Sequence, residues 1–192
     1  DPDSYLKNYH IAGMQGVDTR ALTRCLRESG TMRGMICYGD NINTLEMSRR
    51  IKAFALRSYV PTVSAWDSKT YGDGPRKVAL MDYGVKHNII RSLTQRGCTV
   101  KCFPYDTSFD EVKAWNPDGI MLSNGPGDPK ECGPQIAEIK RMYESDIPIF
   151  AICLGHQLMA LANGGDTYKL KYGHRGVNHP VKDLASNRVY IT

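Results

Sequence analysis

The chain has 192 residues, of which 41% are hydrophobic and 23% charged, and its formal net charge is +5. This is a globular composition, and no apolar run reaches the ~18 residues that a membrane-spanning helix needs. The basic excess is spread along the chain, which argues against a nucleic-acid-binding surface. The one local basic cluster, at 169–175, is interpreted as solvated surface in preference to an anion or partner site.

The cysteines and the N-terminus indicate the cellular compartment. Six cysteines form no Cys-x-x-Cys pair and have no histidine at metal-ligand spacing, so we expect no metal site. The first residues lack the apolar segment of a secretion signal. Reduced thiols without an export signal predict a cytoplasmic protein.

Residues 1–75 are predicted to form part of a smaller α/β domain followed by a linker. Residues 1–16 look irregular, and Asp18 can cap a helix that Gly30 ends, with Leu22 and Leu26 facing inward. Further elements are a strand at 35–38 and an amphipathic helix at 44–58. Periodicity is lost from 61 to 75, which indicates turn and linker and places a domain boundary at residue 75.

Residues 76–192 alternate strand and helix and are predicted to form a second domain. Strands are expected at 77–82, 98–105, 119–123 and 147–153, and helices at 87–96, 109–115 and 134–145. Ser108 and Glu111 form a capping box for the second of these helices. Repeated βα units predict a mostly parallel sheet flanked by helices, with sites at the carboxyl ends of the strands. Short β segments follow at 166–170, 179–181 and 188–192.

Cys153 lies where an apolar segment changes to a helical pattern. The segment at 147–153 is predicted to be a strand buried on both faces, and apolar residues at spacings of three and four follow until Gly164. Such a turn exposes a side chain beside the free N–H groups of the helix start, whose dipole favours a thiolate. A small buried core cysteine fits this stretch equally well.

A glycine-rich loop is predicted at the neighbouring strand end, where residues 123–129 read Ser-Asn-Gly-Pro-Gly-Asp-Pro. Its glycines allow backbone angles closed to other residues and bring N–H groups close to a ligand. Taken alone, the loop fits a rigid turn as well as it fits a site. It matches neither phosphate-binding fingerprint, so ATP binding by this chain is unsupported.

Three motifs in chain order resemble those of one family. They are the loop at 123–129, the Cys-Leu-Gly-His-Gln at 153–157, and the Gly-His-Arg-Gly-Val-Asn-His-Pro at 173–180. The chain resembles the small, glutamine-hydrolysing subunit of carbamoyl phosphate synthetase, a class I (triad) glutamine amidotransferase. Residues 16–23 resemble the end of its N-terminal domain. The resemblance covers nearly all of the chain and implies a flavodoxin-like α/β fold preceded by a partial smaller α/β domain.

The resemblance also implies a site and a partner. Cys153 would attack the glutamine carboxamide and form a γ-glutamyl thioester. The N–H groups of Gly127 and Leu154 would face the oxyanion, and Gly125, Leu154 and Gln157 would hold the substrate. Released ammonia would pass to a large subunit that uses ATP and Mg²⁺, which leaves this chain without a cofactor. Such a cytoplasmic heterodimer would serve arginine or pyrimidine biosynthesis.

The sequence departs from the family pattern in its catalytic base. The family's general-base histidine and its orienting glutamate lie well downstream of the nucleophile, and no residue here matches them. The chain therefore looks truncated at both ends, and we expect these 192 residues alone to be inactive. His156 is interpreted as structural, as are His87, His174 and His179. Ala151 stands where amidotransferases often have glycine.

Two alternatives stay open at this level. The chain could be a non-catalytic module that keeps the fold for docking to a synthetase subunit. It could also be a triad amidotransferase of another pathway, although the segment before Pro75 argues against that interpretation because a free-standing amidotransferase domain needs no such appendage.

Overall fold

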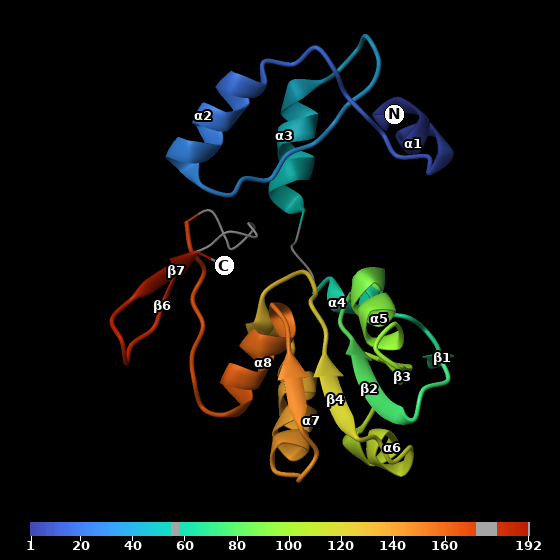
Figure 1. The fold of residues 1–192 in the computed structure, drawn as a ribbon. Helices are drawn as coiled ribbons and strands as arrows, with labels where there is room; N and C mark the ends of the chain where they lie inside the picture. Colours follow the sequence, from blue (N-terminus) through green and yellow to red (C-terminus); the bar gives the residue numbers. More distant parts are fainter. Residues whose placement is uncertain (55–57, 172–179, 192) are drawn as a thin grey trace. The chain divides into compact units, whose positions relative to one another are not determined.

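The computed structural model describes three stretches of the chain, residues 1–54, 58–171 and 180–191. The chain divides into two compact units (Figure 1). Residues 55–168 form the sheet unit, and residues 1–54 together with 169–192 form the N-terminal unit. The domain boundary predicted at residue 75 lies inside the sheet unit.

The sheet unit is built on a five-stranded sheet in the order β1-β3-β2-β4-β5. Neighbours are parallel from β3 to β5, whereas β1 pairs antiparallel with β3. The strands are β1 (Lys69–Tyr71), β2 (Arg76–Asp82), β3 (Cys98–Pro104), β4 (Gly119–Leu122) and β5 (Ile149–Ala151). The helices are α4 (Val60–Val63), α5 (His87–Thr94), α6 (Phe109–Ala114), α7 (Gly133–Tyr143) and α8 (Leu154–Ala162). The predicted α/β fold with a mostly parallel sheet is confirmed.

The strand order creates a switch point between two central strands. The chain runs from β2 outward to β3 and then returns to β4 on the other side of β2. Loops leaving β2 and β4 therefore diverge to opposite sides, which is where sites form in open parallel sheets. Figure 1 shows the arrowheads of β2, β4 and β5 at the same end of the sheet, with α4 beside them.

Alternate strand residues form two apolar clusters, one on each face of the sheet. In one cluster, Met81 and Leu122 pack with residues of α6, α7 and α8. In the other, Leu80 and Met121 pack with residues of α5. Helices therefore cover both faces of the sheet, as the apolar strand sequences predicted.

Strand β5 departs from the prediction that its strand is buried on both faces. Phe150 at its centre is 67% exposed. Within the described residues β5 is an edge strand, because only β4 pairs with it. A run of apolar residues cannot by itself distinguish a central strand from this edge position.

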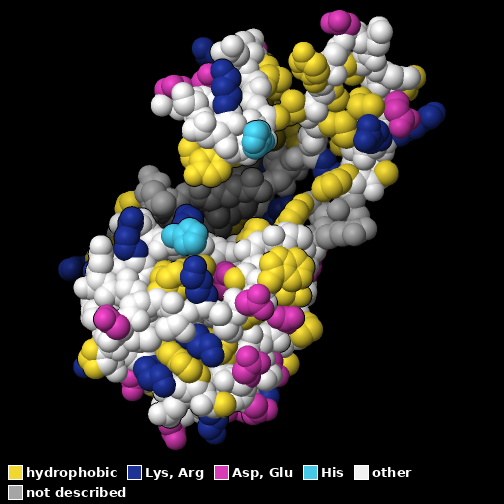
Figure 2. Space-filling model, turned by 90° about the vertical axis from the view of Figure 1, so that its right-hand side faces the viewer, with side chains coloured by type: hydrophobic (Ala, Val, Ile, Leu, Met, Phe, Trp, Pro, Cys, Tyr) yellow, Lys and Arg dark blue, Asp and Glu magenta, His cyan; other side chains and the backbone are white. Residues whose placement is uncertain are grey.

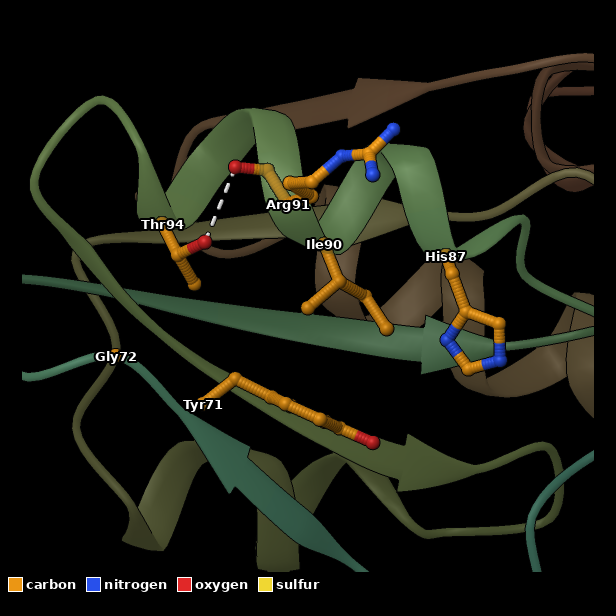
Figure 3. Close-up of a pocket in the computed structure, with 6 residues that line it drawn as sticks. All are labelled: Tyr71, Gly72, His87, Ile90, Arg91 and Thr94. Carbon is orange, nitrogen blue, oxygen red and sulfur yellow. Dashed lines mark hydrogen bonds between the residues drawn. The ribbon is translucent and has the colours of Figure 1, made fainter.

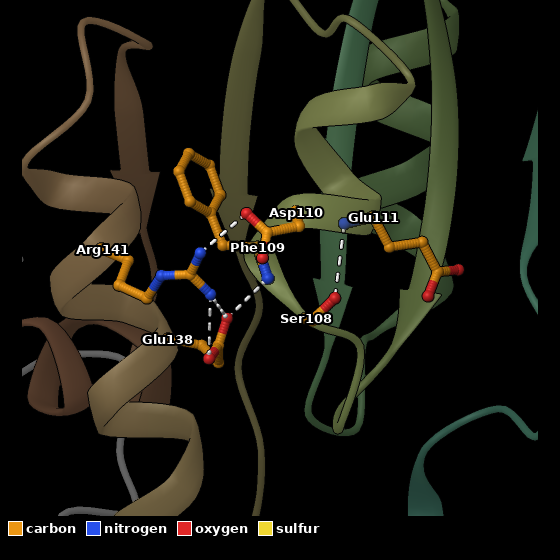
Figure 4. A network of polar contacts seen from close by, with 6 residues as sticks. All are labelled: Ser108, Phe109, Asp110, Glu111, Glu138 and Arg141. Carbon is orange, nitrogen blue, oxygen red and sulfur yellow. Dashed lines mark hydrogen bonds and ion pairs between the residues drawn. The ribbon is translucent and has the colours of Figure 1, made fainter.

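A polar network joins α6 to α7 (Figure 4). Ser108 accepts a hydrogen bond from the Glu111 N–H at 3.3 Å, as the capping box predicts. The second cap comes from a different residue, since Glu138 on α7 accepts a hydrogen bond from the Phe109 N–H at 2.6 Å. Arg141 lies 3.1 Å from the same Glu138 carboxylate. The start of α6 is thereby anchored to α7.

The linker interpretation of residues 61–75 is wrong where α4 and β1 form. Val60 is buried in the core, and Pro61 occupies the first turn of α4, where a missing N–H costs nothing. Tyr71 on β1 packs against the α5 side of the sheet. These elements are only four and three residues long, so no periodicity could reveal them.

The N-terminal unit consists of short elements with almost no buried core. They are α1 (Pro2–Asn8), α2 (Thr19–Ser29), α3 (Thr44–Ala53), β6 (Pro180–Lys182) and β7 (Val189–Ile191). Asp18 caps α2 and Gly30 ends it, as predicted. Leu22 and Leu26, predicted to face inward, are 55% and 39% exposed. Among the described residues of this unit, Gly30 alone is buried.

Four other predictions outside the sheet unit's core are wrong. Residues 2–8 are helical because Asp1 accepts hydrogen bonds from the first-turn N–H groups. The strand expected at 35–38 does not form, since no described strand pairs with it. The helix from Thr44 ends at Ala53. No strand forms at 166–170.

The surface of the sheet unit carries both signs of charge. In Figure 2, lysine and arginine side chains are interspersed with aspartate and glutamate side chains over this unit. No helix in the described residues combines the length and the apolar character that crossing a membrane requires.

Truncation of the Ile139 side chain tests the packing of α7 in the core. Ile139 is fully buried, so Ile139→Ala is expected to lower the free energy of unfolding by about 2–5 kcal/mol through lost burial and a residual cavity. Its exposed neighbour provides the control, because Lys140→Ala should change that free energy by less than about 0.5 kcal/mol. Urea unfolding followed by circular dichroism measures both. Equal effects of the two substitutions would contradict the packing.

Candidate active site

Cys153 occupies a strained turn between β5 and α8. Its φ of 51° and ψ of −109° lie in a region that non-glycine residues rarely adopt. Backbone hydrogen bonds hold both sides of this turn, from the Ile152 N–H to Leu122 at 3.0 Å and from the Gly155 N–H to Ser123 at 3.0 Å. Cys153 itself is exposed. The predicted elbow is present, and the core-cysteine interpretation is excluded.

Gly155 allows α8 to start directly against the end of β4. A Cβ added to it would lie 2.5 Å from the Leu122 carbonyl oxygen, closer than real Cβ atoms approach. Helix and strand can therefore meet here only through a residue without a side chain. This close approach places the first turn of α8, and Cys153 with it, at the carboxyl end of the sheet.

The glycine loop after β4 is packed tightly against the turn after β2. A Cβ on Gly125 would overlap the Tyr83 carbonyl oxygen and would lie 2.7 Å from Cδ2 of Leu154. Ser123 is completely buried, and its hydroxyl accepts a hydrogen bond from the Tyr83 N–H at 2.9 Å. Two sequence-predicted site residues, Gly125 and Leu154, are thus in contact.

The Asn124 side chain also links the glycine loop to the turn after β2. Its Oδ1 accepts a hydrogen bond from the Lys86 N–H at 3.1 Å, and its Nδ2 donates one to the Gly84 carbonyl at 3.0 Å. The glycine loop is therefore bound to the β2 turn at both ends of one amide group. Such double attachment fixes the backbone that follows Asn124.

The two residues whose N–H groups the sequence motifs singled out differ in exposure, because Gly127 is exposed and Leu154 is buried. Gly127 is exposed and has a φ of +100°, which an L side chain rarely adopts. Within the described part of the chain, neither the Gly127 nor the Leu154 N–H has a hydrogen-bond acceptor. Gln157 lies one turn along α8, and its N–H donates to the Cys153 carbonyl at 3.1 Å.

Asp82 organises the base of the site. It is 5% exposed at the end of β2, and its Oδ1 accepts hydrogen bonds from the N–H groups of Gly84 at 2.9 Å and Val85 at 2.8 Å. Its Oδ2 accepts a third from the Ala65 N–H at 3.0 Å. One carboxylate thereby fixes the β2 turn and the segment before β1.

Burial raises the pKa of two further thiols and of one tyrosine hydroxyl near these loops. Burial raises the pKa of Cys102 to about 12, and the Asp82 carboxylate adds to the shift. Burial also raises the pKa of Cys132, with a further contribution from Glu131. The pKa of Tyr83 is raised strongly, chiefly by burial and then by Cys132. These groups stay protonated near neutral pH.

The comparisons with known proteins identify the family. The sequence model of the family described as "Glutamine amidotransferase class-I" matches residues 79–192, more than half of the chain. The chain belongs to this family. A second family model, described as "Carbamoyl-phosphate synthase small chain, CPSase domain", matches residues 1–36 of the amidotransferase.

Two curated relatives of this amidotransferase share the same name. The "Carbamoyl phosphate synthase small chain" of Clostridium perfringens is 50% identical over 190 residues, covering 99% of this chain and 54% of that protein. The same-named protein of Bacillus caldolyticus is 47% identical over 194 residues, covering 99% and 52%. The chain thus spans about half the length of these relatives. A solved structure of a protein described as part of a GMP synthase, from Thermoplasma acidophilum, has a TM-score of 0.45 and 26% identity, covering 56% of this chain and 51% of that chain.

No histidine of the amidotransferase is placed as a base by the described residues. His156 is exposed on α8 and His87 is exposed at the start of α5, and neither hydrogen-bonds Cys153. His174 and His179 lie outside the described residues, as does the motif at 173–180 except for Pro180. Among the described residues, no group of three His, Cys, Asp or Glu could hold a metal ion.

Two pockets lie beside β1 and α5 in the described residues. One of about 410 Å³ is lined by β1 and α5 (Figure 3). Ile90 points into it toward the Tyr71 ring, whereas the Arg91 guanidinium points away. A second pocket of about 280 Å³ shares Tyr71, His87 and Ile90 with the first. Cys153 lines neither of these two pockets.

Asp82, Ser123 and Asn124 help to build the site, but no role was predicted for them from the sequence. Asp82 followed by Gly84 has a local signal, because aspartate commonly accepts hydrogen bonds from N–H groups two and three residues on. Asn124 and Ser123 lie inside the predicted loop, but their partners are about 40 residues away in sequence. Such long-range hydrogen bonds leave no trace in a single sequence.

Substitution at Gly155 tests the close approach of α8 to β4. Alanine usually stabilises a helix relative to glycine by about 1 kcal/mol, but here its Cβ meets the Leu122 carbonyl. Gly155→Ala is therefore expected to lower the free energy of unfolding by about 1–3 kcal/mol. Gly133→Ala is the control, since nothing lies within 4 Å of its added Cβ at the start of α7. If both variants unfold at the same urea concentration, the close approach is refuted.

Thiol mapping tests the exposure of the elbow. At a pH of about 8 in the native protein, iodoacetamide is expected to alkylate the exposed Cys25 and Cys153 faster than the buried Cys98, Cys102 and Cys132. The raised pKa of Cys102 and Cys132 further suppresses their thiolate. Peptide mass spectrometry over a time course gives each rate. Alkylation of Cys102 as fast as Cys153 would be inconsistent with the described burial.

Proposed function

We propose that this amidotransferase is the glutamine-hydrolysing part of a carbamoyl phosphate synthase small subunit. The relatives at 50% and 47% identity over 99% of the chain support the assignment to a carbamoyl phosphate synthase small subunit. The observation that carries the chemistry is the contact between Leu154, which follows the exposed Cys153, and Gly125 of the glycine loop. This contact joins a nucleophile and a donor loop, the two parts that an acyl-transfer site requires.

In the proposed reaction, the Cys153 thiolate attacks the carboxamide carbon of glutamine. A C–S bond forms, and the carbonyl electron pair moves onto oxygen, where the N–H groups of Gly127 and Leu154 face the charge. Collapse of this intermediate breaks the C–N bond, and the nitrogen takes up a proton to leave as ammonia. Water then hydrolyses the γ-glutamyl thioester to glutamate and restores the thiol. Gly125, Leu154 and Gln157 hold the glutamine.

The partner and the cofactors follow from the proposed assignment. Ammonia passes to a large subunit, which combines it with bicarbonate in steps that use ATP and Mg²⁺, while this chain uses no cofactor. The complex is a cytoplasmic heterodimer that serves arginine or pyrimidine biosynthesis. The 192 residues contain no match to the family's general base, so we infer that glutamine turnover by this chain alone is negligible.

Covalent labelling tests the proposed nucleophile. A chloromethyl ketone analogue of glutamine should modify Cys153 with loss of chloride, and millimolar glutamine should protect against it. Cys153→Ser should abolish the modification, whereas Cys25→Ser, at an exposed cysteine of the other unit, should leave it unchanged. Intact-protein mass spectrometry measures the label. Labelling no faster than with chloroacetone, which lacks the amino acid part, would favour the non-catalytic docking module instead.

A further inference from the structure

The Asn124 side chain is held at both ends of its amide group by the turn after β2. The residue is half-buried, its Oδ1 accepts a hydrogen bond from the Lys86 N–H at 3.1 Å, and its Nδ2 donates to the Gly84 carbonyl at 3.0 Å. This turn is itself fixed, because Asp82 accepts hydrogen bonds from two of its N–H groups. Asn124 therefore ties the start of the glycine loop to a well-anchored part of the sheet unit.

The peptide between Asn124 and Gly125 is held by a second group. The buried Ser123 hydroxyl accepts a hydrogen bond from the Tyr83 N–H at 2.9 Å and donates one to the Asn124 carbonyl at 2.8 Å. The Asn124 side chain and the plane of the next peptide are thus both fixed relative to the β2 turn. From this fixed point the chain enters Gly125, which lies against the Tyr83 carbonyl and Leu154.

Residues 125–127 depend on this attachment for their conformation. Among the described residues, none makes a backbone-to-backbone hydrogen bond with this segment. Two of its three residues are glycines, which rotate their peptides at little cost, and Gly127 has a φ of +100°. The next buried residue downstream is Pro129. Release of the Asn124 amide would therefore allow Gly125 and Gly127 to leave their observed conformation.

The nucleophile is positioned independently of the Asn124 side chain. Backbone hydrogen bonds from the N–H groups of Ile152 and Gly155 hold the Cys153 turn at 3.0 Å, and their acceptors are backbone carbonyls. Neither bond involves the Asn124 amide. A substitution at Asn124 should consequently change the glycine loop and leave the exposure of the Cys153 thiol as it is.

We propose that Asn124 is a positioning residue for the acyl-transfer site: its amide holds the glycine loop in the conformation that presents Gly125 and the Gly127 N–H to glutamine. This inference rests on the proposed function. Both ends of the amide are occupied by backbone partners, so Asn124 acts only through the backbone that follows it. The role requires a donor and an acceptor on one side chain, which an aspartate carboxylate does not offer. Its second oxygen would face the Gly84 carbonyl oxygen, and two acceptors repel each other.

The test compares two alkylations of Cys153 in the full chain. The glutamine chloromethyl ketone places a carbonyl oxygen at the proposed oxyanion site, whereas iodoacetamide reports only thiolate exposure. Asn124→Asp should lower the chloroketone-to-iodoacetamide rate ratio about tenfold, less than the roughly 10²–10³ seen for removal of a whole oxyanion donor. Asn124→Ala, which removes both hydrogen bonds, should lower the ratio in the same direction. Mass spectrometry of the Cys153 peptide over a time course gives both rates.

Asn163 provides the matched control. It is exposed at the end of α8, it precedes a glycine as Asn124 does, and its Nδ2 donates to the Met159 carbonyl at 2.8 Å. Asn163→Asp therefore also removes a hydrogen bond between a side-chain amide and a backbone carbonyl. Because this bond joins two residues of the same helix end and attaches no loop of the candidate site, the variant should keep the wild-type ratio.

The outcomes separate this inference from the proposed function. A wild-type ratio no higher than the ratio measured with chloroacetone in place of the glutamine analogue overturns both. A higher wild-type ratio that a folded Asn124→Ala protein keeps overturns the positioning role alone, as does an equal loss in Asn163→Asp. If Asn124→Asp unfolds, Asn124→Ala decides the question. Unfolding of both variants would assign the amide to stability and would likewise overturn the positioning role.

Discussion

The carboxylate of Asp82 is the interaction on which the site's architecture depends. Buried at the end of β2, it is satisfied by three backbone N–H groups, two from the β2 turn and one from Ala65. A buried carboxylate that lost these partners would be strongly destabilising, so the β2 turn and the segment before β1 are held together by this side chain. The glycine loop then packs on this pair of segments. The position of Gly125, which lies against the Tyr83 carbonyl of this turn, thereby depends on a carboxylate that makes no hydrogen bond to it.

The site also requires backbone segments to approach each other closely, and glycine allows this at two positions. Gly125 lies against the Tyr83 carbonyl, and Gly155 lies against the Leu122 carbonyl. Together they bring loops from β2, β4 and β5 to one place at the carboxyl end of the sheet. The strained φ of Cys153 persists because hydrogen bonds from Ile152 and Gly155 fix the residues on either side.

Sequence patterns predicted the sheet unit well because its signals are local. Period-2 strands, the Ser108 cap and the change of pattern at Cys153 each depend on neighbours within a few residues. The misses depend on distant partners: β1 is held by β3, α4 by the packing of its own Val60 in the core, and the expected strand at 35–38 has no partner to pair with among the described strands. For the candidate site, Cys153, Gly125, Gly127, Leu154 and Gln157 were predicted from motifs, whereas Asp82 acts through long-range and local hydrogen bonds that no motif contains.

A crystal structure of this amidotransferase with the glutamine chloromethyl ketone bound tests the central claim most directly. That claim is that the Cys153 turn and the glycine loop form one acyl-transfer site with Gly127 and Leu154 as donors. The account predicts a bond to Cys153 and the ketone-derived oxygen about 2.7–3.1 Å from both N–H groups. An oxygen directed into solvent, with the Gly127 N–H turned away from it, would contradict the account.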